Sequence, residues 1–242
     1  MSTSKYCLIR QPAGLGDILF CQKVAKKVIN KYNLDVIWPI IPEFIDIIPY
    51  ISSERISYVS TNDRFQGKEL YESSTNTVID TDKILYIPLQ HADQLQLDYS
   101  VMVSKYKQVG LSYHDWPDYV TFNRDIVKEQ KLYSNILNLK EGEEYIFVNK
   151  NYGSPPTTQQ CHHININTSK RIVNMDYYEG FNMFDWCKVI ERASEIHTVD
   201  TAIVCIAEKL DLCEDINIYS RWDPPNFRHV EPILYAGWKY NY

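Results

Sequence analysis

Two short turns in the sequence carry the side chains best suited to chemistry. In the first, Gly14-Leu15-Gly16 is followed at once by Asp17. Two glycines permit a tight turn and a close approach of the backbone to a ligand, so Gly14 and Gly16 are candidate binding residues. An ionised carboxylate at the mouth of a cleft can accept a proton from a hydroxyl group, which makes Asp17 a candidate general base. The alternative is that Asp17 only caps a helix that starts here.

The second turn is Asp200-Thr201-Ala202, between a strand-like run and a nearly all-apolar segment. Backbone N–H groups where a helix begins can bind a diphosphate, and the Thr201 hydroxyl adds a further donor. The small side chain of Ala202 leaves room for a ligand to approach. Here too the alternative is ordinary helix capping, by Asp200 or Thr201.

Two basic residues could neutralise such a diphosphate. Lys150 directly follows a predicted strand and would act as a point charge, whereas Arg171 carries a planar fork that matches phosphate oxygens. The alternative for each is an ordinary solvated cation at the surface. Neither residue alone establishes a diphosphate site.

Alternating strands and helices must position these residues. The predicted strands are 6–10, 34–38, 56–60, 83–88, 144–149, 171–175, 195–199 and 216–219, and the predicted helices include 18–31, 99–109, 184–193 and 201–210. This alternation is typical of an α/β fold in which helices cover both faces of parallel sheets. Because the pattern restarts near Glu144, we expect two small Rossmann-like domains, 1–125 and 126–242. Ligands of such sheets bind at the carboxyl ends of strands, where both turns lie.

The two turns together resemble the GT-B glycosyltransferases of the heptosyltransferase type, a glycosyltransferase family 9-like group. Those proteins have a Gly-x-Gly-Asp-like turn near the start and a late Asp-Thr-Gly-x-x-His-x-Ala helix start; here Ala202 replaces the glycine and Cys205 the histidine. The resemblance implies an inverting, metal-independent hexosyl- or heptosyl-type transferase. Its partners would be a nucleotide-sugar donor, which is a co-substrate and not a cofactor, and a glycan or lipid-linked acceptor.

The resemblance also implies roles for individual residues. Asp17 would be the catalytic base in an N-terminal acceptor domain. Asp200 to Ala202 would contact the diphosphate or sugar of the donor in a C-terminal domain, and Lys150 would be the basic residue after that domain's first strand. A short chain, Ala202 and Cys205 favour the alternative of a non-catalytic carbohydrate- or nucleotide-binding module on the same fold.

A different metal-dependent class of glycosyltransferase, GT-A, offers another alternative. Asp80-Thr81-Asp82 follows an apolar run, and two carboxylates at this spacing could hold Mn²⁺ or Mg²⁺ with a nucleotide-sugar. The triplet precedes a predicted strand and does not end one, so we interpret it as a surface turn.

Other candidate metal ligands lack the right spacing. Cys161-His162-His163 are adjacent, adjacent residues rarely converge on one metal ion, and no second ligand pair is evident. His197 lies inside a predicted strand, where histidine is usually packed or hydrogen-bonded. We therefore expect no metal site.

Composition limits the partners and the cellular compartment that we expect for this protein. The net charge is −6 among 242 residues, which disfavours a nucleic-acid partner bound by broad phosphate neutralisation. The six cysteines form no pair motif, and neither a signal sequence nor an apolar run near 20 residues is visible. We therefore expect a reduced, cytoplasmic protein without a transmembrane segment.

Overall fold

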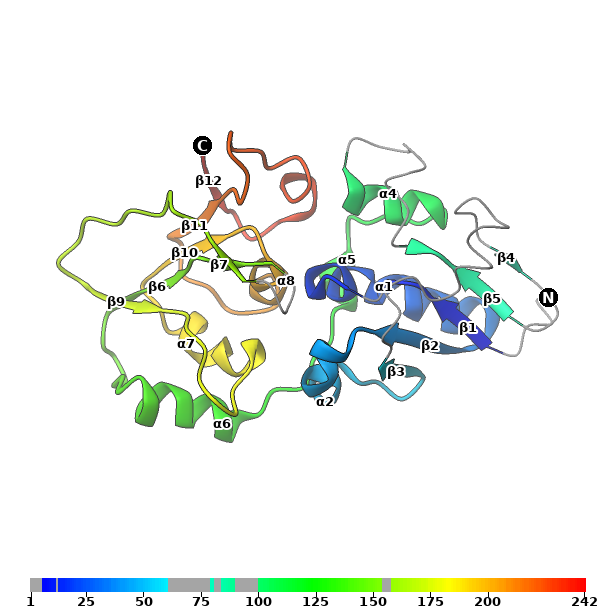
Figure 1. The fold of residues 1–242 in the computed structure, drawn as a ribbon, viewed down its shortest axis with the longest axis horizontal. Helices are drawn as coiled ribbons and strands as arrows, with labels where there is room; N and C mark the ends of the chain where they lie inside the picture. The colour runs from blue at the N-terminus through cyan, green and yellow to red at the C-terminus, as the bar shows by residue number, and fades with distance from the viewer. Residues whose placement is uncertain (1–5, 12, 61–78, 81–83, 90–99, 154–157) are drawn as a thin grey trace. The chain divides into compact units, whose positions relative to one another are not determined.

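The structure is a computed structural model that describes residues 6–11, 13–60, 79–80, 84–89, 100–153 and 158–242 (Figure 1). The chain divides into two compact units. The first comprises Met1–Asn123 and Arg228–Ile233, and the second comprises Arg124–Phe227 and Leu234–Tyr242. The first division lies close to the predicted boundary after residue 125, whereas residues 228–233 return to the first unit.

The first unit is built on a five-stranded sheet. Its strands are β1 (Tyr6–Ile9), β2 (Asp35–Ile40), β3 (Ile56–Ser60), β4 (Ile79–Asp80) and β5 (Ile84–Ile87), in the spatial order β3-β2-β1-β5-β4. All neighbouring pairs are parallel except β4 and β5. The chain moves from β1 to β2 and β3 on one side and then returns to β5 on the other side of β1. The carboxyl ends of β1 and β5 therefore form a topological switch point, where such sheets bind ligands.

Helix α1 (Leu15–Tyr32) is the main cover of this sheet. Its apolar residues repeat with helical spacing, and they are buried, Ile18, Phe20 and Val24 completely. The ring of Phe20 packs edge-to-face against Tyr106 and Trp116. Among the described residues, the further helices of this unit are η1 (Pro42–Ile47), α2 (Ile48–Ile51), α4 (Val101–Gln108), α5 (Trp116–Tyr119) and η5 (Glu231–Ile233).

The second unit is built on a five-stranded, all-parallel sheet. Its strands are β6 (Tyr145–Asn149), β9 (Arg171–Asn174), β10 (Glu195–Val199), β11 (Ile216–Tyr219) and β12 (Lys239–Asn241), in the order β12-β11-β10-β6-β9. The connection from β9 to β10 crosses to the other side of β6, so the switch point of this sheet lies between β6 and β10. A small antiparallel pair, β7 (Asn151–Tyr152) and β8 (Gln159–Gln160), follows β6.

Helices and an irregular segment complete the second unit. The helices are α6 (Ile126–Lys131), η3 (Leu132–Ile136), η4 (Met183–Trp186), α7 (Cys187–Glu191) and α8 (Ala202–Ala207). Helix α8 is buried along nearly its whole length because its residues are almost all apolar. Arg124 joins α6 to α7 by ion pairs with the buried Glu129 and with Glu191. Cys161 and Ile164 pack on strand residues of β6 and β10.

The predicted fold class is confirmed, since both units are Rossmann-like, with mainly parallel sheets flanked by helices. Each of the predicted strands corresponds to an observed one, although the short strands β4, β7, β8 and β12 were not predicted. In the part of the chain that the structure describes, no helix is both long and apolar enough to cross a bilayer.

Candidate functional site

Asp17 lies in the first turn of α1, directly after the switch point of the first sheet. The helix begins after Gly14, which is the N-cap residue and makes no side-chain capping bond, so Asp17 does not occupy the capping position. Its side chain is 30% exposed, and its Oδ1 lies 3.1 Å from the ammonium nitrogen of Lys105. Asp17 is therefore a partly accessible carboxylate in an ion pair.

Lys105 is a buried cation that the sequence analysis missed. It comes from α4, its side chain is only 2% exposed, and its ammonium donates to Gln11 Oε1 at 2.5 Å and to the Leu89 carbonyl at 3.3 Å. Gln11 follows β1 and Leu89 follows β5, so Lys105 links both strand ends of the switch point to Asp17. A buried ammonium needs such acceptors to offset its lost hydration.

Gly14 makes room for the Asp17 carboxylate. Its φ is +80°, and a Cβ at this position would lie 2.3 Å from Asp17 Oδ2. A side chain here would therefore displace the carboxylate as well as strain the backbone. The second predicted glycine, Gly16, lies inside the first turn of α1.

The second predicted turn lies at the switch point of the second sheet. Asn149 ends β6, and its buried amide donates to the hydroxyls of Thr198 at 3.0 Å and Thr201 at 3.4 Å. Because Thr201 accepts this bond, its own hydroxyl hydrogen can donate to a ligand. Thr201 is the N-cap residue of α8 but makes no side-chain capping bond, and Ala202 is the first residue of the helix. Asn149 was not predicted.

Asp200 is fully buried beside this turn. Its Oδ1 accepts from the backbone N–H of Arg221 at 2.8 Å and lies 3.4 Å from the Arg221 Nε, and its Oδ2 has no hydrogen-bond partner among the described residues. Burial raises the pKa of the Asp200 carboxyl to about 6, although the positive charge of Arg221 acts in the opposite direction. Asp200 therefore holds Arg221 and does not cap α8.

The two predicted phosphate-binding cations lie at opposite edges of the sheet. Lys150 directly follows β6, and its ammonium makes no ion pair or hydrogen bond within the described ranges. Arg171 begins β9 in register with Tyr145, the first residue of β6. Its guanidinium is bound to Glu143 at 2.7 Å and to the Leu137 carbonyl at 2.5 Å. The structure therefore brings Lys150, and not Arg171, to the edge that carries Thr201.

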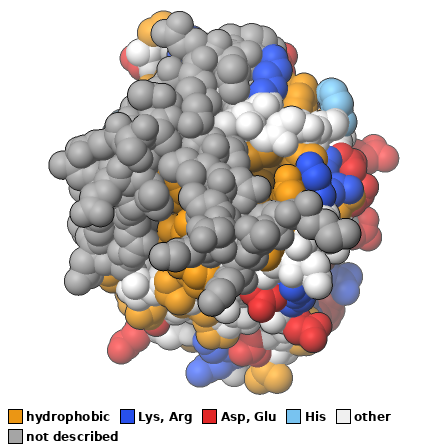
Figure 2. Space-filling view, turned by 90° about the vertical axis from the view of Figure 1, so that its right-hand side faces the viewer, with side chains coloured by type: hydrophobic (Ala, Val, Ile, Leu, Met, Phe, Trp, Pro, Cys, Tyr) orange, Lys and Arg blue, Asp and Glu red, His pale blue; other side chains and the backbone are white. Residues whose placement is uncertain are grey.

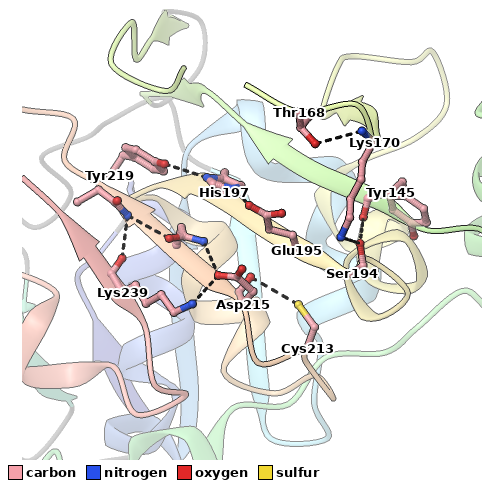
Figure 3. A network of polar contacts seen from close by, with 12 residues as sticks. Tyr145, Thr168, Lys170, Ser194, Glu195, His197, Cys213, Asp215, Tyr219 and Lys239 are labelled. Carbon is pink, nitrogen blue, oxygen red and sulfur yellow. Dashed lines mark hydrogen bonds and ion pairs between the residues drawn. The ribbon is translucent and has the colours of Figure 1, made fainter. Parts of the chain in front are cut away.

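The other candidate residues are held in structural contacts or lie outside the described residues. His197 accepts or donates hydrogen bonds at both ring nitrogens, to Glu195 at 2.6 Å and to Tyr219 at 2.8 Å (Figure 3). Cys161 is buried with its thiol 3.7 Å from the Ser220 carbonyl. No group of potential metal ligands occurs among the described residues.

Only part of the alternative metal site, Asp80-Thr81-Asp82, lies among the described residues. Asp80 belongs to β4, at the antiparallel edge of the first sheet. Asp82 lies outside the described residues.

Comparisons with known proteins support the fold. No family model and no curated protein matches the sequence. Among solved structures, the chain is similar to a glycosyl transferase family 9 protein from Veillonella parvula, with a TM-score of 0.55 at 9% identity, covering 100% of this chain and 87% of that one. It is also similar to E. coli ADP-heptose LPS heptosyltransferase II, with a TM-score of 0.52 at 9% identity, covering 98% and 90%. The predicted resemblance is thus confirmed at the level of the fold.

Proposed function

We propose that this chain is a glycosyltransferase that moves a sugar from a nucleotide-sugar donor to a hydroxyl acceptor. The observation that carries this proposal is the placement of Asp17 and of Thr201, each at the carboxyl edge and topological switch point of its own sheet. This is where ligands bind in such sheets. The fold that these sheets share with glycosyltransferases supports the same proposal.

On the acceptor side, Asp17 acts as the general base. Lys105 engages Oδ1, while Oδ2 lies in the space that Gly14 leaves open. As the acceptor oxygen attacks the anomeric carbon of the donor sugar, its proton passes to the Asp17 carboxylate. The bond between that carbon and the diphosphate oxygen breaks on the opposite side, so the configuration inverts. The leaving group is a nucleoside diphosphate.

On the donor side, the second unit stabilises the departing diphosphate. The Thr201 hydroxyl, oriented by Asn149, donates to a phosphate oxygen, and the ammonium of Lys150 neutralises charge. Positioned donors and cations at the leaving group lower the energy of the transition state. Arg171 takes no part in this proposal because Glu143 and the Leu137 carbonyl bind it at the opposite edge.

We further propose that the acceptor is a glycan or lipid-linked hydroxyl compound and that nucleic acid is no partner. On the face drawn in Figure 2, acidic and basic side chains of the described residues are mixed and form no single-sign basic field. A protein that binds a nucleic-acid backbone needs such a field.

The test begins with thermal-shift screening of the whole chain against nucleotide-sugars, because a ligand that binds only the folded state raises its stability. Transfer to a panel of acceptors is then measured for the wild type and for Asp17→Asn. Asp17→Asn should fold normally and lose roughly 10²- to 10⁴-fold in turnover. The exposed Asp46→Asn serves as the matched control and should keep wild-type turnover. Wild-type turnover in Asp17→Asn would remove Asp17 as the base.

A non-catalytic sugar- or nucleotide-binding module on the same fold is the second candidate. The ion pair with Lys105 favours it, because one oxygen of the Asp17 carboxylate is already engaged. Under this alternative, nucleotide-sugars stabilise the chain, yet no acceptor in the panel receives a sugar and no donor is hydrolysed.

A further inference from the structure

We propose that Arg221 is a diphosphate-binding cation at the carboxyl edge of the second sheet and that Asp200 holds it in place. This inference rests on the proposed function, since it names the part of the same donor site that binds phosphate. Arg221 would take the role that the sequence assigned to Arg171.

The order of the strands places Arg221 at the donor edge. Strands β11, β10 and β6 are neighbours, and their carboxyl ends lead directly into the loops that carry Arg221, Thr201 and Lys150. Adjacent strands lie roughly 4.8 Å apart, so β11 and β6, the two strands that lead to Arg221 and Lys150, are separated by roughly 10 Å. Two long cationic side chains can therefore approach one diphosphate from both sides of Thr201.

The flanking loops are tied to each other through Cys161. Its backbone N–H donates to the Lys150 carbonyl at 2.8 Å, and its thiol lies 3.7 Å from the carbonyl of Ser220, the residue before Arg221. Buried Cys161 thus fixes the two loops that present the cations.

Asp200 anchors the Arg221 backbone by a hydrogen bond and pairs with its guanidinium by charge. Asp200 Oδ1 receives the backbone N–H of Arg221 and faces its Nε, while the two terminal nitrogens of the guanidinium have no partner among the described residues. The Arg221 side chain is 33% exposed, and of its guanidinium nitrogens only Nε is a buried atom without a hydrogen-bond partner among the described residues. A guanidinium presents paired donors in the planar geometry that phosphate oxygens accept.

The burial of Asp200 supports a positioning role. Taking a carboxylate out of water is costly unless a cation and hydrogen bonds compensate it, and its Oδ2 has no partner within the described part of the chain. A buried ion pair of this kind adds little to the stability of the fold, but it fixes the position of Arg221. Asp200 is therefore a positioning residue that acts through Arg221.

The test measures the binding of inorganic pyrophosphate and of ADP to the whole chain by calorimetry. Arg221→Gln should weaken both ligands by roughly 10- to 100-fold, as expected for the loss of hydrogen bonds between charged groups. Arg221→Lys, which keeps the charge but loses the fork, should weaken them less. Arg55→Gln is the matched control, because Arg55 Nε faces Asp35 Oδ1 in an exposed pair of the first unit. It should bind both ligands as the wild type does.

A double-mutant cycle tests the role of Asp200. Asp200→Asn should weaken pyrophosphate binding in the wild-type background but add little in the Arg221→Gln background, a coupling that a general loss of structure does not produce. Thermal unfolding verifies that each variant folds; if Asp200→Asn does not, the two Arg221 variants carry the test. Wild-type affinity in Arg221→Gln, or no binding of either ligand by the wild type, would overturn the inference.

Failure of this inference can be told from failure of the proposed function. If pyrophosphate binding depends on Arg221 but no acceptor receives a sugar, the phosphate site is supported and the proposed glycosyltransferase activity is rejected. Sugar transfer by Arg221→Gln with an unchanged donor KM supports the enzyme and removes Arg221 from the site.

Discussion

At the level of single residues, the position of the Asp17 carboxylate depends on two neighbours, Gly14 and Lys105. Gly14 lacks a Cβ at the place that Asp17 Oδ2 occupies, and Lys105 carries a buried positive charge against Oδ1. Lys105 therefore holds one carboxylate oxygen, and the missing Cβ of Gly14 leaves room for the other. The first glycine of the Gly-Leu-Gly-Asp turn thus leaves space for the aspartate side chain, in addition to any role in ligand binding.

Gly14→Ala tests this arrangement. An alanine forced into a left-handed conformation costs roughly 1–2 kcal/mol, and here its Cβ also collides with the carboxylate. We expect a larger loss of unfolding free energy than in Gly142→Ala, because Gly142 has a similar φ of +78° and a Cβ added there would meet no atom within 4 Å. Chemical denaturation of both variants measures the difference. Equal losses would show that the carboxylate moves aside without cost.

Asp200 predicts a dependence of stability on pH. Burial raises its pKa from an ordinary 3.8 to about 6, so between these values the folded chain binds a proton more tightly than the unfolded chain. The contribution of Asp200 to the free energy of unfolding should therefore be most favourable below about pH 4. It should decrease by up to about 3 kcal/mol as the pH rises through about 6.

Urea unfolding of the wild type and of Asp200→Asn at steps from pH 4 to pH 7.5 measures this contribution. The difference between the two stability curves isolates Asp200, because other titrating groups are common to both. A difference that stays constant over this range contradicts the prediction.

At the scale of elements, strand direction explains which predicted residues meet. A residue that follows a strand of a parallel sheet lies at the carboxyl edge, and a residue that begins one lies at the amino edge. Lys150 follows β6, whereas Arg171 begins β9. The sequence contained this information, because the predicted strand 171–175 already began at Arg171, so its position could have been derived from direction alone.

Other features of the site depend on long-range contacts that local patterns do not encode. Lys105 lies beside Tyr106 in a helix that was predicted, but its burial depends on Gln11 and Leu89 from distant strands. The three-residue strand β12 owes its existence to pairing with β11. The only local signal for Lys105 was its place one turn after the apolar Val101, which puts a charge on the same side of the helix.

The C-terminal tail of the second unit is held by Glu208, which follows α8. Its carboxylate accepts from the backbone N–H groups of Tyr235 and Ala236 at 3.1 Å and from the Trp238 indole at 2.8 Å. Glu208→Ala removes all three bonds just before β12, so we expect faster amide exchange at Lys239–Asn241. Hydrogen exchange measures this change, with the exposed Glu179→Ala as control. Unchanged protection of β12 would show that strand pairing alone fixes the tail.

At the level of the whole molecule, the two units place their candidate residues at the same position of the sheet but use different side chains there. Each places its candidate residues at the switch point of a parallel sheet, after β1 and β5 in the first unit and after β6 and β10 in the second. The first site combines a carboxylate with a buried lysine, and the second combines hydroxyl and amide donors with cations. An acceptor that loses a proton suits the former, and a leaving group that gains negative charge suits the latter.

This division of charge predicts sugar transfer that needs no metal ion. In our proposal Lys150 and Arg221 bind the diphosphate, so these side chains would take up the charge that Mn²⁺ or Mg²⁺ neutralises in metal-dependent transferases. Transfer should proceed at the wild-type rate in excess EDTA and should not rise when Mn²⁺ is added. Asp80→Asn should have no effect under either condition. The opposite outcome is activity that disappears with EDTA, returns with Mn²⁺ and is lost in Asp80→Asn. It would show that the donor phosphates bind a metal ion held by Asp80 and Asp82, because carboxylates can bind phosphate only through a bound cation.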